Sequence, residues 1–332
     1  MTLLLRESEV AALLPMEAAI EVMEQALVAF SRGHVLQPVR QALTITPHGG
    51  YLGLMPAHIR GGTAPGDAPA ALGAKAVTFY TGNAERNLPT HMAVILLWDP
   101  QTGTPLAIMD GRFITEVRTA ATSAAATKAL ARPEATVLAL LGSGVQARSH
   151  LQALRRVRTL REVRVWSRTP GHGERLAREA SDRYLPVRAC ASAEEAVRGA
   201  DLIVTATSSA SPVLEGRWLR AGVHINAVGA PRPDRRELDT AAIVRSRVFV
   251  DSRAGALAES GDLLHPLKEG AIDEGHILGE VGEVLAGTLP GRTSAEEITL
   301  FKSLGMAVED VATAAYVYAQ ATARGVGEEI TL

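Results

Sequence analysis

One stretch limits the fold of this chain more than any other. A nearly continuous apolar run, Thr136–Leu141, leads into Gly-Ser-Gly-Val-Gln-Ala and then into a helical pattern. Gly142 permits a tight turn, Gly144 lets the backbone approach a pyrophosphate, and Ala147 permits close packing of helix on strand. A helix that begins here offers free N–H groups and its positive dipole end to an anion, which predicts a dinucleotide-binding turn. The residues expected to contact the cofactor are Gly142, Gly144, Val145 and Gln146.

Strands and helices alternate around this turn. The expected strands are Thr136–Leu141, Glu162–Trp166, Asp201–Thr205, Val223–Val228 and Arg247–Asp251. This rhythm predicts a Rossmann-type, doubly wound parallel sheet over residues 119–307, with helices on both faces.

The first third of the chain has a different pattern, with two helices followed by strand-like runs that Gly/Pro clusters separate. Ala93–Trp98 and Leu106–Asp110 flank a turn and predict a hairpin. An apolar stripe from Val308 to Ala319 predicts a last helix that returns to this part of the chain. We therefore expect an α/β chain in which a second, α+β domain is formed by residues 1–118 together with 308–332.

Three local patterns give further expectations. Ser8 is a plausible N-cap for a helix over Glu9–Leu14. Ser294 and Glu297 have the spacing of a capping box at the start of another helix. Glu259–Asp262 is interpreted as a solvated turn rather than as a pair of catalytic acids.

Composition excludes several classes of protein. The 34 Lys and Arg nearly balance the 36 Asp and Glu, for a net charge of −2, so a polycationic nucleic-acid binder is not expected. The single cysteine, Cys190, cannot form an intrachain disulfide. No run approaches the roughly 18 to 20 apolar residues of a membrane span, and no secretory signal is evident, so we expect a cytoplasmic protein. The nine histidines show no i, i+4 pair, so we expect no metal site.

The end of the second strand of the sheet predicts which dinucleotide binds. An Asp or Glu there would accept hydrogen bonds from the adenosine ribose of NAD. This chain has Ser167, Arg168 and Thr169 instead. Arg168 can pair with a 2′-phosphate and the two hydroxyls can assist, so NADP(H) is preferred, with NAD(H) as the alternative.

Three cations stand in settings where burial is unfavourable. Arg40 follows Pro38 just before a strand, Lys75 lies inside the apolar run Leu72–Val77, and Arg118 interrupts a helix of small residues. A buried cation needs an anion or a hydrogen-bond partner. Each is therefore either a substrate-binding group or a salt-bridged structural residue.

Several segments together carry a resemblance that covers nearly the whole chain. They are Gly53–Pro56, Gly73–Thr78, Asp110–Arg112, Thr115–Ala121, Gly142–Ala147, His224–Ala230 and Phe301–Gly305. With these segments the chain resembles the ornithine cyclodeaminase/mu-crystallin family. The string Thr-Glu-Val-Arg-Thr-Ala-Ala is specific to that resemblance. The resemblance implies a homodimer, a dimerisation and substrate domain built from both chain ends, and NAD(P)-dependent interconversion of amino acids and imines.

The resemblance also implies roles for individual residues. Arg40, Lys75 and Arg118 would gather around the substrate carboxylate and the reacting nitrogen, as the catalytic residues. Arg118 would also touch a cofactor phosphate. The further residues expected on the cofactor side are Thr90, His91, Thr119, Thr207 and Val228.

Two departures from the family pattern decide the subclass. Ornithine cyclodeaminases carry a Glu and an Asp where this chain has Gly53 and Pro231. Neither residue present here can transfer a proton, which favours the ketimine reductase branch. The expected reaction is NAD(P)H-dependent reduction of Δ1-pyrroline-2-carboxylate or Δ1-piperideine-2-carboxylate to L-proline or L-pipecolate. The alternatives are ornithine cyclodeaminase, an alanine or N-alkyl amino acid dehydrogenase, and a non-catalytic NADPH-dependent binding protein.

Overall fold

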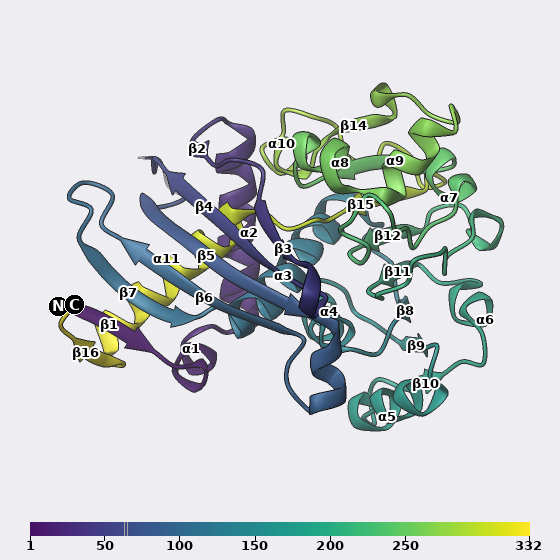
Figure 1. Ribbon diagram of the computed structural model, residues 1–332. Coiled ribbons are helices and arrows are strands. Elements are labelled where there is room, and N and C mark those ends of the chain that lie inside the picture. Colours follow the sequence, from purple (N-terminus) through teal and green to yellow (C-terminus); the bar gives the residue numbers. More distant parts are fainter. Residues whose placement is uncertain (63, 65) are drawn as a thin grey trace. The chain divides into compact units, whose positions relative to one another are not determined.

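The chain forms two units in a computed structural model that describes all residues except 63 and 65. Unit 1 contains Met1–Arg118 and Gly305–Leu332, and unit 2 contains Thr119–Leu304. Helix α3 (Arg112–Leu130) begins in unit 1 and continues into unit 2 (Figure 1).

Unit 1 is built on an eight-stranded sheet in the order β16-β1-β7-β6-β5-β4-β2, with β3 paired to β4. Its strands are β1 (Thr2–Leu5), β2 (Val35–Leu36), β3 (Gln41–Ile45), β4 (Gly50–Ile59), β5 (Ala71–Tyr80), β6 (His91–Trp98), β7 (Pro105–Asp110) and β16 (Glu328–Ile330). Its helical segments are α1 (Glu7–Leu13), α2 (Met16–Ser31), η1 (Thr46–His48), η2 (Thr81–Arg86) and α11 (Ala307–Arg324). The predicted hairpin is present as the antiparallel pair β6–β7.

Helix α11 lies along one face of this sheet, against β4 and β5 (Figure 1). Val308, Val311 and Val317 bury the apolar stripe of the helix. The two meet closely at Gly73 of β5, because a Cβ there would lie 3.1 Å from a methyl of Val311. This contact brings the buried first turn of α11 to the middle of β5.

Unit 2 is the predicted Rossmann-type parallel sheet, in the order β10-β9-β8-β11-β12-β15-β13-β14. Its strands are β8 (Val137–Leu141), β9 (Glu162–Trp166), β10 (Val187–Ala189), β11 (Leu202–Thr205), β12 (His224–Ala227), β13 (Arg247–Val250), β14 (Ile277–Glu280) and β15 (Thr299–Lys302). Its helical segments are α4 (Val145–Val157), α5 (Pro170–Ala180), α6 (Ala193–Val197), η3 (Gly216–Trp218), α7 (Thr240–Val244), α8 (Arg253–Glu259), α9 (Gly261–Lys268), η4 (Glu274–His276) and α10 (Val281–Leu285). Every strand pair in this sheet is parallel, so the expected fold class is confirmed.

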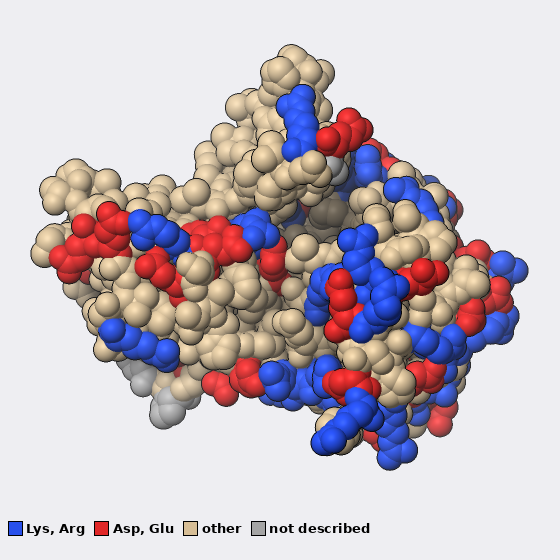
Figure 2. All heavy atoms as spheres, turned by 90° about the horizontal axis from the view of Figure 1, so that it is seen from below, with Lys and Arg blue, Asp and Glu red and all other residues tan. Residues whose placement is uncertain are grey.

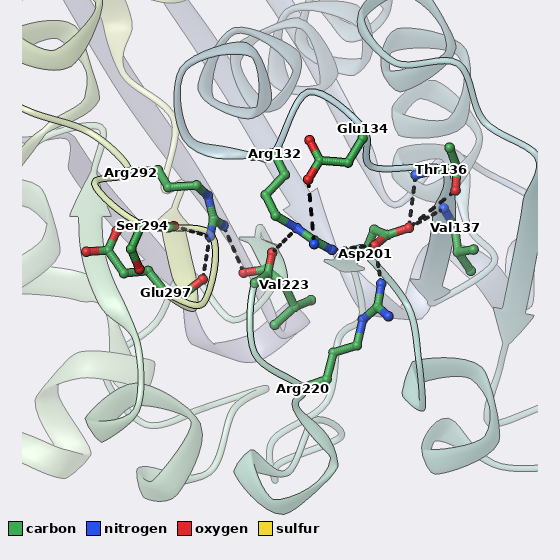
Figure 3. A network of polar contacts seen from close by, with 12 residues as sticks. Arg132, Glu134, Thr136, Val137, Asp201, Arg220, Val223, Arg292, Ser294 and Glu297 are labelled. Carbon is green, nitrogen blue, oxygen red and sulfur yellow. Dashed lines mark hydrogen bonds and ion pairs between the residues drawn. The ribbon is translucent and has the colours of Figure 1, made fainter.

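A polar network closes the amino-terminal edge of this parallel sheet (Figure 3). The carboxylate of Asp201, just before β11, accepts the backbone N–H groups of Thr136 and Val137, both at 3.0 Å. Arg132 donates to the same carboxylate at 2.7 Å, and Arg220 also pairs with it. Gly142–Gly144 follows the opposite end of β8. The network therefore stabilises the edge of the sheet that is remote from the predicted nucleotide turn.

Charged side chains of both signs lie interspersed on the face that Figure 2 shows, as the near-zero net charge suggests. None of the described helices combines the length and hydropathy that a bilayer span requires. The cytoplasmic location stays a prediction.

Two of the expected helix starts are wrong. Helix α1 begins at Glu7 rather than after Ser8, because the carboxylate of Glu9 accepts the backbone N–H of Arg6 at 2.7 Å. Residues 290–298 form an irregular segment that leads into β15, and no helix follows Ser294. There Glu297 accepts the backbone N–H of Thr293 at 2.7 Å, so its carboxylate serves a loop instead of a helix.

The interpretation of Glu259–Asp262 as a solvated turn is also wrong. Ser260 and Asp262 are fully buried where α8 meets α9. A carboxylate in such a place needs polar partners. Asp262 finds them in Lys302 and in backbone N–H groups.

Candidate active site and nucleotide-binding turn

Lys75 lies at the centre of the sheet in unit 1, in an apolar row. Its register neighbours are Met55 on β4 and Ile95 on β6, and Ile95 in turn pairs with Met109 on β7. All three are buried, and only 2% of Lys75 is exposed. An ammonium group held this way is far from bulk water, so it requires an anion from another element.

Helix α11 supplies that anion. The Asp310 carboxylate lies 2.6 Å from the ammonium of Lys75 and accepts a hydrogen bond from Nε of Arg118 at 2.9 Å. Glu309 accepts a second hydrogen bond from Arg118 at 2.6 Å. Both carboxylates are fully buried. Two cations and two anions therefore form one buried group, and Lys75 also donates to the hydroxyl of Thr115 at 3.4 Å.

This environment changes the acidity of Lys75. The pKa of Lys75 is lowered to about 8, chiefly by burial; Asp310 acts to raise it, and Arg118 and Arg40 act in the same direction as burial. Although burial acts to raise the pKa of Asp310, Arg118 and Lys75 hold it below its usual value. Lys75 is thus an amine that can give up a proton near neutral pH, beside a carboxylate that stays ionised.

Two other predicted residues of unit 1, Arg40 and His91, interact electrostatically with this group. Arg40 is half-buried, and its charge acts to lower the pKa of Lys75. Thr90 and His91 are at the start of β6, where the carbonyl of Thr90 accepts the backbone N–H of Tyr80 at 2.8 Å. Burial, with Lys75 and then Arg118, lowers the pKa of His91 to about 4, which leaves its imidazole neutral.

The sequence reasoning missed Glu309 and Asp310. A signal was present, because two consecutive acids interrupt the apolar stripe of α11 between Val308 and Val311. Such acids are rarely buried without partners. Their partners lie about 190 residues away for Arg118 and further still for Lys75, so only the fold reveals the pairing.

The predicted turn of unit 2 has the geometry that a dinucleotide requires. Gly142 adopts φ +122°, and a Cβ there would lie 2.5 Å from the carbonyl oxygen of Ala206. At Gly144 a Cβ would meet nothing within 4 Å, so the loop leaves open space for a phosphate. Helix α4 begins at Val145, with Ala147 packed at 1% exposure. Gln146 Oε1 is buried with no hydrogen-bond partner among the described residues, as a ligand-facing amide would be.

Ser167, Arg168 and Thr169 follow the carboxyl end of β9, and Thr169 is the N-cap of α5. The hydroxyl of Ser143 donates to that of Ser167 at 2.9 Å, which joins this segment to the glycine turn. Arg168 is exposed. Thr119 lies inside α3, at the start of unit 2. Thr207 and Val228 come just after β11 and β12, so they share the carboxyl edge of the sheet with the turn.

A parallel sheet with this glycine turn at its carboxyl edge defines a Rossmann-type dinucleotide-binding protein. The sequence model of the ornithine cyclodeaminase/mu-crystallin family matches residues 1–325. The chain belongs to this family, as its motifs predicted.

Relatives extend over nearly the whole chain. The mouse (Mus musculus) ketimine reductase mu-crystallin is 46% identical over 302 residues, which is 90% of each chain. A solved structure of Thermococcus litoralis Δ1-pyrroline-2-carboxylate reductase in complex with NADH and L-proline matches with a TM-score of 0.94 and 40% identity, covering 99% of this chain and 100% of that one. An archaeal alanine dehydrogenase dimer with bound NAD matches with a TM-score of 0.93 and 36% identity, covering 100% and 99%.

Proposed function

We propose that this chain is an NAD(P)H-dependent ketimine reductase. Its substrates are Δ1-pyrroline-2-carboxylate, Δ1-piperideine-2-carboxylate or both, and its products are L-proline and L-pipecolate. The observation that carries the proposal is the buried ammonium of Lys75, whose pKa of about 8 lies near working pH. The reductases among the relatives act on this class of compound.

The substrate carboxylate is bound by arginine. Arg118 is fixed in place by Glu309 and Asp310, and Arg40 is half-buried near Lys75. A guanidinium offers paired donors that match the two oxygens of a planar carboxylate. Arg40 is the principal clamp in this proposal, with Arg118 nearby.

Reduction of a C=N bond needs one hydride and one proton. Bound NAD(P)H supplies the hydride to the imine carbon. Lys75 gives its proton to the imine nitrogen. The iminium formed in this way accepts hydride better than the neutral imine does, and Lys75 afterwards takes a proton back from solvent. Asp310 keeps Lys75 protonated at neutral pH despite burial, because its charge raises the pKa of Lys75. Activity should therefore be full below about pH 8 and fall as the pH rises through that value.

The glycine turn of unit 2 holds the dinucleotide phosphates, with Gly142, Gly144, Val145 and Gln146 as the backbone contacts. Arg168, with the hydroxyls of Ser167 and Thr169, binds the 2′-phosphate of NADPH. NADPH is thus the preferred cofactor and NADH the weaker one. Thr90, His91, Thr119, Thr207 and Val228 complete the proposed cofactor contacts.

The cyclodeaminase alternative is disfavoured by Gly53. Its register partner on β5 is Val77, two residues from Lys75 on the same face of the sheet, and a Cβ at Gly53 would lie 3.1 Å from a methyl of Val77. The space that a glutamate side chain would need at this position is therefore taken up in part by Val77. No acid at this position serves the second amine of ornithine.

We also propose a homodimer. The face of the sheet opposite Lys75 carries the register row Leu54–Ala76–Val94, and Leu54 and Val94 are 47% and 46% exposed. Exposed apolar surface of this kind fits a second copy of the chain. Sedimentation velocity should give twice the chain mass for the wild type and a monomer for Leu54→Glu/Val94→Glu. A monomeric wild type would refute the assignment.

A substrate panel tests the function. The protein is assayed for NADPH and NADH oxidation with the five- and six-membered cyclic imines, and with pyruvate plus ammonia or methylamine. Ammonia release from L-ornithine is measured in parallel. The proposal predicts turnover of at least one cyclic imine, faster than any other reaction. Ammonia release as the fastest reaction, or tight NADPH binding without turnover, would contradict it.

A further inference from the structure

One buried carboxylate joins the two loops that follow β11 and β12 in unit 2. Glu237 is fully buried. One of its oxygens accepts the backbone N–H of Thr207 at 2.6 Å, and the other accepts the backbone N–H of Gly229 at 2.9 Å. The two segments are also joined by backbone, because Val228 donates its N–H to the carbonyl of Thr205, the last residue of β11, at 2.9 Å. The carboxylate of Glu237 therefore joins the backbones of both loops, in addition to this direct hydrogen bond.

Two further charged groups hold this carboxylate in place. Asp262 accepts the backbone N–H groups of Glu237 and Leu238 at 2.7 and 3.0 Å. Its other oxygen accepts Nζ of Lys302 at 2.8 Å. Lys302 and Asp262 are both fully buried. Lys302 also donates to the carbonyl oxygen of Gly229 at 2.5 Å, so the cluster binds Gly229 at both its N–H and its C=O.

The backbone at Gly229 and Ala230 is tightly constrained. A Cβ at Gly229 would collide with the carboxylate of Glu237 and with the carbonyl oxygen of Thr207. The next residue, Ala230, adopts φ +53°, a left-handed conformation that a non-glycine residue seldom takes. Strain of this kind persists where surrounding contacts impose it, and it is common at ligand-binding sites.

The position of the cluster indicates what it serves. In parallel sheets, ligands bind outside the carboxyl ends of the strands. The two loops follow the carboxyl ends of β11 and β12, one and two strands along from β8, which carries the glycine turn. A dinucleotide whose pyrophosphate lies at Gly142–Gly144 extends its nicotinamide half along this edge. The loops at Thr207 and Val228 are thus placed for the nicotinamide half rather than for the adenosine half.

We propose that Glu237, Asp262 and Lys302 are positioning residues that hold the loops at Thr207 and Val228 in the shape that receives the nicotinamide half of the dinucleotide. The proposal rests on the nucleotide binding of the proposed function. None of the three side chains touches the cofactor in this account. They act through the backbone of Thr207 and Gly229.

The test compares full dinucleotides with fragments that lack nicotinamide. Binding of NADPH, NADH, ADP-ribose and 2′-phospho-ADP-ribose to the whole chain is measured by calorimetry for the wild type and for Glu237→Gln. Glutamine keeps the shape but turns an NH2 group toward one of the two N–H donors. Loss of a charge-assisted hydrogen bond predicts a Kd about 10- to 100-fold higher for the dinucleotides. The Kd of the fragments should stay within about twofold of the wild-type value, because their sites at Gly142–Gly144 and Arg168 are not held by Glu237.

Asp201→Asn is the matched control. Asp201 is also a buried carboxylate that accepts two backbone N–H groups, but at the amino-terminal edge of the same sheet (Figure 3). It should leave the ratio of dinucleotide to fragment affinity unchanged. If Glu237→Gln does not fold, Lys302→Met, which removes the hydrogen bond to the carbonyl of Gly229, should weaken binding of the dinucleotides but not of the fragments.

The outcomes separate the two proposals. Equal weakening of dinucleotides and fragments, or no weakening of either, would overturn the positioning role while wild-type binding keeps the proposed cofactor. The positioning role would also be overturned if Lys302→Met and Asp201→Asn gave the same ratio of dinucleotide to fragment affinity. A wild-type chain that binds neither NADPH nor NADH would overturn the proposed function and this inference with it.

Discussion

Asp310→Asn removes the charge that opposes the effect of burial on Lys75. The carboxylate lies 2.6 Å from the ammonium, and Asp310 is the main group that raises the pKa of Lys75. An opposite charge at this range shifts a pKa by about 1–3 units, or about 1.4–4 kcal/mol. The pKa of Lys75 should therefore fall from about 8 to about 7 or below in the variant.

The assay is the pH profile of kcat/KM for the cyclic imine that the wild type reduces. Because the protonated form of Lys75 is the active one, activity is present below the pKa and is lost as the pH rises through it. The descending limb should lie near pH 8 in the wild type and at least about one unit lower in Asp310→Asn. Glu309→Gln is the control, since Glu309 bonds Arg118 and should move the limb less. Equal limbs in the wild type and Asp310→Asn would refute the reasoning.

The same substitution tests the stability of the buried group. Breaking a buried ion pair by removal of one partner lowers the free energy of unfolding by about 3–5 kcal/mol. Asparagine keeps an oxygen for one donor, so we expect the lower part of this range in urea unfolding. The pH profiles are therefore recorded at a temperature where circular dichroism shows that the variant is folded.

Two predictions concern the nucleotide. Arg168→Asp should raise the KM for NADPH about 10- to 100-fold and improve use of NADH, because it removes a charge-assisted contact and adds a ribose acceptor; retained NADPH preference in steady-state assays would show that Arg168 does not bind the 2′-phosphate. Gly142→Ala places a Cβ 2.5 Å from the carbonyl of Ala206 at φ +122°, so it should lower stability by about 1–3 kcal/mol and weaken binding of ADP-ribose. Wild-type affinity for that fragment in calorimetry would contradict the assignment of the turn.

Much of unit 2 could be predicted because its signals are local. The strand, glycine turn and helix at 137–157 follow one another without a break, and the predicted alternation of strands and helices is what the sheet contains. Less of unit 1 could be predicted from the sequence. Its edge strand β16 and the neighbouring strand β1 are short, and they are defined by pairing between chain ends, as in Leu3 with Glu329. Sequence periodicity carries no information on such distant pairing.

The candidate active site could likewise be predicted only in part from the sequence. Lys75 and Arg118 could be selected because a cation among apolar or small residues is unusual in any context. Their anions could not be assigned, since Asp310 lies in a helix more than 190 residues from Arg118. Asp262 was misinterpreted because a Ser-Gly-Asp sequence is typical of a solvated turn, whereas here Lys302 and the backbone of Glu237 compensate its burial. In each case the compensating group comes from a distant element.

Single-turnover reduction of a cyclic imine by the Lys75→Met variant shows whether Lys75 supplies the proton. Methionine keeps the length and packing of the side chain in its apolar row but has no proton to give. If Lys75 is the proton donor, the variant should bind NADPH with wild-type Kd and reduce the imine at least about 100-fold more slowly, within the range that general acid catalysis contributes. Reduction of the imine at the wild-type rate would show that another group supplies the proton.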